Sequence, residues 1–114
     1  MEQIDARELT RDVLPKLKAT EHLIDNTLKM RIETCQDETE RERLTRIQQE
    51  FELEMMMIRM NLEHLLKRYS DQLKAASEGR QHFTSPLLEM DDSESVAIES
   101  AKRLYRRAQE LQTR

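Results

Sequence analysis

The chain has 114 residues, enough for one domain, and charged residues are as frequent as hydrophobic ones, at 37% each. With one glycine, two prolines and no tryptophan, this composition is typical of long helices and argues against strands and tight turns, so we predict an all-α fold. The net charge of −4 disfavours direct binding to nucleic acid or to anionic membranes, because both attract basic surfaces.

The first predicted helix covers about residues 4–36. Pro15 cannot donate a backbone N–H, which allows a break there, with Asp12 capping a helix that starts afresh. An apolar stripe follows, and two further residues widen it: Leu17, Ile24, Leu28 and Cys35, then Leu23 and Met30. Cys35 is the only cysteine, which excludes an intrachain disulfide and a cysteine-rich zinc site.

A charged segment without apolar residues, 36–43, follows the first helix. Thr39 and Glu42 have the spacing of a capping box, in which each side chain satisfies an unpaired N–H at a helix start. We therefore interpret 35–39 as a turn, so that the apolar stripes of two antiparallel helices face each other. A continuous helix with a charged, exposed face stays as the alternative, because no glycine or proline enforces the turn.

The second predicted helix, about residues 39–78, is the element around which the chain is organised. It would be roughly 57 Å long, whereas a compact domain of this size is about 35 Å across, so we expect an elongated, coiled-coil-like hairpin. Gly79 stands where a left-handed residue commonly ends a helix. The main apolar stripe recurs in steps of three and four: Leu44, Ile47, Phe51, Met55, Ile58, Leu62, Leu65, Tyr69, Leu73 and Ala76.

A second apolar set on this helix points away from the main stripe: Leu53, Met57, Met60 and Leu66. Methionine suits adaptable binding surfaces, although a methionine stripe is more often core. Because Met55, Met56 and Met57 are consecutive, they point in different directions, and at least one of them leaves the main stripe. We predict that a partner covers this wide apolar girdle, with coverage by other helices of the same chain as the alternative.

The rest of the chain is predicted to be a loop, 79–92, and a third helix, 93–112. Phe83, Leu87, Leu88 and Met90 give the loop more apolar surface than a flexible loop usually has, so we expect part of it to dock on the helices. Acids open the last helix and basic residues fill its later turns, as the helix dipole prefers. The helical pattern continues to Arg114, which indicates a frayed end or a chain cut short. The buried seam of this helix is predicted to be Ala97, Ala101, Leu104, Ala108 and Leu111, broadened by Val96, Ile98 and Tyr105.

No residue pattern indicates catalysis, a cofactor or a metal. His22, His64 and His82 are far apart and lack a glutamate three positions before them, so the di-iron pattern of helical bundles is absent. A single glycine excludes a glycine-rich phosphate loop, and Cys35 has no histidine near it in the sequence. We predict a protein that is not an enzyme and has no cofactor, metal or small-molecule substrate. Without a long apolar run or a secretory signal pattern, it is expected to be soluble and intracellular, whether cytoplasmic or nuclear.

The run Gln49-Glu50-Phe51-Glu52-Leu53-Glu54 opens a helix that continues to Tyr69, and a loop and a last helix from Ser93 follow it. This layout resembles the helical domain of GINS subunits, which belong to the DNA replication machinery. The resemblance implies that the chain is a subunit of a multi-protein replication complex.

Taken from the residues alone, the predicted function is that of a non-catalytic interaction subunit or scaffold in a helical assembly. Its partners would be proteins, either further copies of the chain or different chains. One alternative is an export-type chaperone that sequesters a partner's amphipathic helix, and the other is the GINS-like role. The residues predicted to bind partners are Leu53, Met56, Met57, Met60, Leu66, Leu87 and Leu88.

Overall fold

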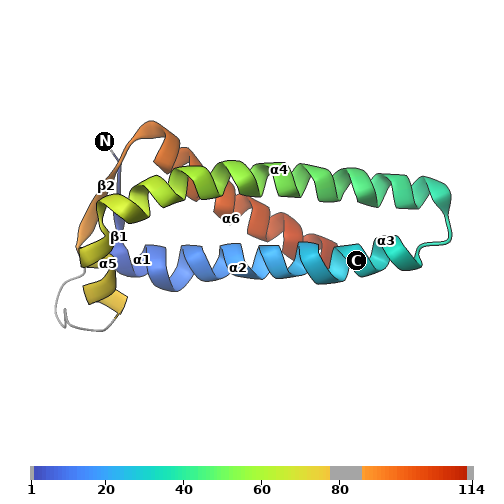
Figure 1. Cartoon of the computed structure of the whole chain (residues 1–114), viewed down its shortest axis with the longest axis horizontal. Coiled ribbons are helices and arrows are strands. Elements are labelled where there is room, and N and C mark those ends of the chain that lie inside the picture. The colour runs from blue at the N-terminus through green and yellow to red at the C-terminus, as the bar shows by residue number, and fades with distance from the viewer. Residues whose placement is uncertain (1, 78–85, 113–114) are drawn as a thin grey trace.

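The computed structural model describes residues 2–77 and 86–112. Over these residues the protein is an elongated helical hairpin with a last helix packed on it and a small two-stranded sheet at one end (Figure 1). In chain order the elements are β1 (Glu2–Asp5), α1 (Ala6–Glu8), η1 (Leu9–Val13), α2 (Leu14–His22), η2 (Leu23–Leu28), α3 (Lys29–Thr34), α4 (Glu38–Arg68), α5 (Ser70–Ser77), β2 (Leu87–Met90) and α6 (Asp92–Gln112).

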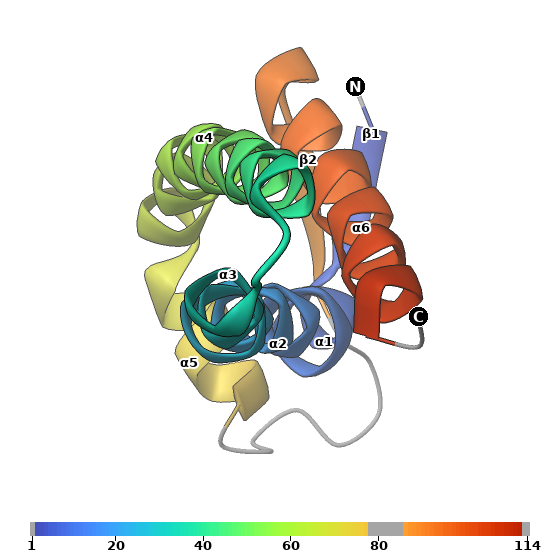
Figure 2. The same cartoon turned by 90° about the vertical axis from the view of Figure 1, so that its right-hand side faces the viewer.

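The predicted all-α hairpin with a third, C-terminal helix is confirmed. The segments from α1 to α3 form one helical arm, called the first arm here, which runs antiparallel to α4 (Figure 1). Viewed along the long axis, the first arm, α4 and α6 lie at the corners of a triangle (Figure 2). The molecule measures 54 × 26 × 19 Å and has a radius of gyration of 16.5 Å, larger than the roughly 13 Å of a compact domain.

The first arm stays helical through Pro15, so the break allowed there is not formed. The segment before Pro15, η1, is a π-helix in which the N–H of Leu14 donates to the carbonyl oxygen of Leu9. This wide turn ends at Val13, and only Leu14 separates it from Pro15, whose ring and missing N–H conflict with a regular α-helical turn. Asp12 lies inside η1 rather than at a helix start.

The turn between the two arms is at residues 35–37, which confirms the hairpin over a continuous helix. Asp37 caps α4, because its Oδ1 accepts hydrogen bonds from the N–H groups of Thr39 at 3.0 Å and Glu40 at 3.5 Å. The prediction that Thr39 is the cap, paired with Glu42, is therefore wrong. An aspartate that satisfies the first free N–H groups makes the threonine unnecessary in that role.

The core forms along the predicted main stripe of α4. Six residues of this stripe are at most 6% exposed: Leu44, Phe51, Met55, Ile58, Leu62 and Leu65. The first arm contributes Leu9, Val13, Leu17, Leu23 and Ile24 to the same core cluster, and α6 contributes Ala97, Ile98, Ala101, Leu104 and Ala108. Leu28 and Leu44 are buried outside this cluster. The small alanines allow α6 to pack closely against both arms. Met30 and Val96, predicted to widen the buried faces, are 64% and 61% exposed because they lie on the outward sides of their helices.

The small sheet is a feature that the sequence reasoning missed. β1 and β2 pair antiparallel, with Ile4 opposite Leu88, so residues 4 and 5 are in a strand rather than a helix and residues 87–90 are not a loop. Ile4, Leu88 and Met90 are each at most 4% exposed. The expectation that part of the 79–92 connection docks on the helices is confirmed for this strand, while Phe83 lies outside the described residues.

The long helix is interrupted at Tyr69, where the predicted helix 39–78 divides into α4 and α5. Tyr69 has φ −119° and ψ 26°, outside the helical region, and its hydroxyl oxygen accepts a hydrogen bond from the N–H of Glu89 at 3.3 Å. After this bend α5 lies against α1, and Leu73 enters the core. Gly79, the predicted helix stop, lies outside the part of the chain that the structure describes.

Polar contacts join α6 to both ends of the first arm. Lys102 Nζ donates to Glu8 Oε1 at 2.9 Å, and this hydrogen bond raises the pKa of the Lys102 amine above its usual value. Arg31 Nη1 donates to the carbonyl oxygen of Leu111 at 2.8 Å. These contacts hold the middle and the C-terminal end of α6 against the first arm, and with the apolar seam they place α6 over the buried stripe of α4.

We expect the aspartate variants I58D and L62D to unfold the domain or to lower its free energy of unfolding by about 4 kcal/mol. Ile58 and Leu62 are each 2% exposed, so the new charge would have no access to water. Urea denaturation followed by circular dichroism measures this. The neighbouring variant M57D is the control, because Met57 is 57% exposed and a charge there should leave the unfolding midpoint nearly unchanged.

Candidate protein-binding surface

Four large apolar side chains lie exposed on the side of α4 that faces away from the core. Leu53, Met56, Met57 and Met60 are 60%, 58%, 57% and 67% exposed. Their spacing of three, four and seven positions places them on one helix face over two turns. We call this surface the outer patch. All four were predicted to bind partners, and the structure brings them together.

The other three predicted residues lie elsewhere. Leu66 is partly buried against the core, and Leu87 is 60% exposed on β2. Leu88 is fully buried, so it belongs to the chain's own core and its prediction as a partner-binding residue does not fit the structure. The reason is that successive side chains of a strand point to opposite faces, which turns Leu87 outward and Leu88 inward.

A groove of about 390 Å³ runs beside the outer patch, between the first arm and α4. Its lining is Glu21, Ile24, Asp25, Glu52, Met55, Met56, Arg59, Met60 and Glu63. Ile24 and Met55 are buried core residues that form an apolar floor, while Met56 and Met60 belong to both the groove and the outer patch. The groove therefore extends the apolar surface of α4 sideways onto η2.

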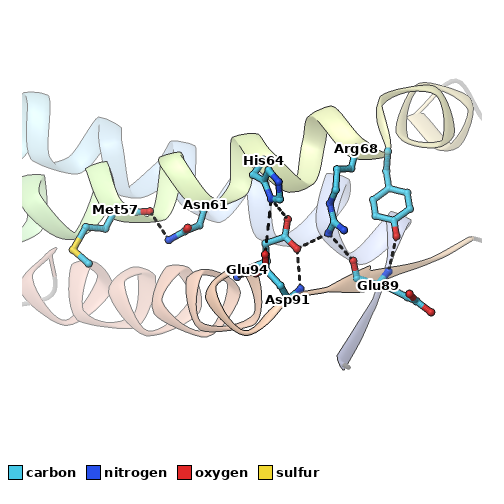
Figure 3. A network of polar contacts seen from close by, with 8 residues as sticks. Met57, Asn61, His64, Arg68, Glu89, Asp91 and Glu94 are labelled. Atoms are coloured by element: carbon cyan, nitrogen blue, oxygen red, sulfur yellow. Dashed lines mark hydrogen bonds and ion pairs between the residues drawn. The ribbon is translucent and has the colours of Figure 1, made fainter.

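A polar network holds the start of α6 against α4 (Figure 3). Glu94 is only 1% exposed, and its Oε1 accepts hydrogen bonds from Arg68 Nη2 at 2.5 Å and from the N–H of Asp91 at 2.9 Å. Asp91 Oδ1 in turn accepts from the N–H of Glu94 at 2.7 Å, so the two acids form a capping box. His64 Nδ1 lies 3.0 Å from Glu94 Oε2. Sequence reasoning treated these acids only as complements of the helix dipole, although the spacing of Asp91 and Glu94 is the signal that could have revealed the box.

The network acts as a structural clamp. Within the described residues, the ligand atoms of His64, Asp91 and Glu94 lie within 4.8 Å of one another, a spacing that could hold a metal ion. However, the guanidinium of Arg68 already supplies a positive charge at the buried carboxylate. Arg68 also donates to the carbonyl oxygen of Glu89 at 2.9 Å, so one side chain joins α4, β2 and α6 (Figure 3).

Comparisons with protein-family models, with curated proteins and with solved structures found no match. The resemblance to GINS helical domains therefore stays a prediction. In the described part of the chain, no helix combines the length and apolar character required to cross a membrane.

Replacing Arg68 with alanine is expected to lower the free energy of unfolding by about 1–3 kcal/mol, because the buried Glu94 carboxylate would lose its cation. Chemical denaturation measures the loss. Arg46→Ala removes an exposed arginine of the same helix that has no ion-pair partner among the described residues, and it should leave stability unchanged. Equal effects of the two substitutions would show that Arg68 contributes no more than a surface charge.

Proposed function

We propose that this chain is a non-catalytic subunit that binds a protein partner through the outer patch of α4. The observation that carries the proposal is the gathering of Leu53, Met56, Met57 and Met60 on one exposed helix face. Scattered exposed apolar residues need no explanation, but contiguous apolar patches mark interaction sites. The opposite face of α4 is packed against the first arm and α6, so the patch is presented on a rigid element.

The side chains of the outer patch suit this role. Methionine is flexible and polarisable, so three methionines can adapt to a partner's surface. Burying each exposed side chain of the patch would contribute about 1–2 kcal/mol, and part of this sum is offset by the entropy lost on association. The patch alone therefore supports a modest affinity, and further contacts around it are needed for a stable complex.

The charges beside the patch favour a different chain as partner over a second copy. If two copies paired antiparallel about the midpoint of the patch, between Met56 and Met57, Glu50 would face Glu63 and Arg46 would face Lys67. Both contacts join like charges, and they outnumber the one opposite-charge pair that this register creates between residues 46 and 67, Glu54 with Arg59, which disfavours such a symmetric dimer. An export-type chaperone would use the same surface and stays as the alternative, and the GINS-like role is one instance of a heteromeric subunit.

The test compares the double variant M57D/M60D with M30D, a variant at an exposed methionine outside the patch. A charge in the patch should leave the folded chain intact but become costly when a partner covers it, so co-purification of the native partner should fall by about tenfold or more. Co-purification with the wild-type chain and with M30D should be equal. Circular dichroism melts of all three chains check that folding is unchanged.

Loss of folding in M57D/M60D would show that these methionines are core residues. Undiminished partner recovery with the folded double variant would contradict a partner interface at the patch.

Sedimentation separates the two proposed classes of binding protein. An assembly subunit sediments as a stable complex with a cooperative melt, whereas a chaperone is a loosely packed monomer that tightens on binding a client helix.

A further inference from the structure

We propose that the partner segment is an amphipathic helix with basic residues beside its apolar stripe, and that it lies in the groove between η2 and α4. This inference rests on the proposed function and specifies the chemistry of the partner. It follows from the shape of the groove, the nature of its walls and the charges on its rim.

The groove is long enough for a short helix. Glu52 and Glu63 mark its two ends along α4, and the rise of an α-helix places them about 16 Å apart, the length of about three helical turns. Over this length the apolar floor of Ile24 and Met55 continues into Met56 and Met60. Apolar residues at positions i, i+3, i+4 and i+7 of an added helix would reach this floor together.

The walls of the groove favour a helix over an extended peptide. Both walls are helices, α4 and the first arm, whose backbone N–H and C=O groups are bonded within each helix. An added strand would find no free sheet edge in the groove, and its own backbone groups would lose water without gaining partners. A helix satisfies its backbone groups internally and offers only side chains to the groove.

The charges on the rim select a basic occupant. Glu21 is paired with Arg59, whose Nε donates to Glu21 Oε1 at 2.8 Å. Asp25, Glu52 and Glu63 are exposed and have no ion-pair or hydrogen-bond partner among the described side chains, so three carboxylates surround the apolar floor without compensation. Lysine or arginine on the flanks of a bound helix would face these carboxylates, while acidic flanks would be repelled. Such rim charges set specificity and the rate of association more than affinity.

The probe for this inference is a synthetic peptide of about 18 residues, held helical by a side-chain lactam because a short free helix is marginal in water. It carries leucine at positions i, i+3, i+4 and i+7 and lysine on both flanks. One comparison peptide has glutamate in place of every lysine, and another has the lysine peptide's composition in scrambled order. Fluorescence anisotropy measures binding of each peptide to the full chain at low and at physiological salt.

We expect the lysine peptide to bind at least about tenfold more tightly than either comparison peptide, and to weaken by about tenfold with the double variant E52K/E63K. The control variant E33K/E42K makes the same charge change at exposed positions outside the groove and should bind within about twofold of the wild-type chain. Equal weakening by the two double variants would reduce the effect to overall charge and overturn the inference.

Two other outcomes also overturn the inference, and they bear differently on the proposed function. If the lysine and glutamate peptides bind equally and M57D/M60D weakens both, the outer patch binds helices but does not select basic ones. If the lysine peptide does not bind, the groove is not a site for such a helix. The proposed function is then judged separately by recovery of the native partner with M57D/M60D and M30D.

Discussion

The structure depends on one constraint: α4 has apolar residues on two opposite sides, and the residues that the structure describes cover only one of them. The inner stripe from Phe51 to Leu65 is buried by the first arm and by α6. Nothing among the described residues covers Leu53, Met56, Met57 and Met60 on the outer side. A three-helix arrangement buries one face of each helix at the centre, so the second apolar face of α4 stays exposed among the described residues, and we propose that a partner covers it.

The position of α6 decides which face of α4 stays open. Its alanine seam fits closely between the arms, and the clamp around Glu94 fixes its first turn against Arg68 (Figure 3). Buried ion pairs contribute little net stability, but an unpaired buried carboxylate is costly, so alternative placements of α6 that separate Glu94 from Arg68 are disfavoured. The polar clamp thus sets the position of α6, and the apolar seam supplies most of its packing.

Much of the fold could be predicted from the sequence because a helix with one buried face repeats its apolar residues every three or four positions. The steps of three and four through Phe51, Met55, Ile58 and Leu62 predict the buried stripe, and the same reasoning separates Met57 and Met60 from it. Features that depend on contacts distant in sequence were missed. The pairing of Ile4 with Leu88 has no local signal, and it buried a leucine that had been predicted to bind a partner. The outward direction of Val96 and the helical path through Pro15 likewise depend on neighbours that sequence reasoning could not place.

The candidate surface was predictable in part for the same reason. Helical spacing identifies the four residues of the outer patch. The groove beside it could not be predicted, because that requires knowing that η2 packs next to α4 and that Asp25 of the first arm belongs to the acidic rim.

The most direct test of the central claim is methionine oxidation by hydrogen peroxide, followed by peptide mass spectrometry, in the purified chain and in its native cell. In the purified chain Met56, Met57 and Met60 should react quickly and Met55 slowly. In the cell, where we propose that a partner covers the outer patch, the three should become protected while Met30 stays reactive. Equal oxidation of the outer patch and Met30 in both settings would contradict the claim that a partner covers α4.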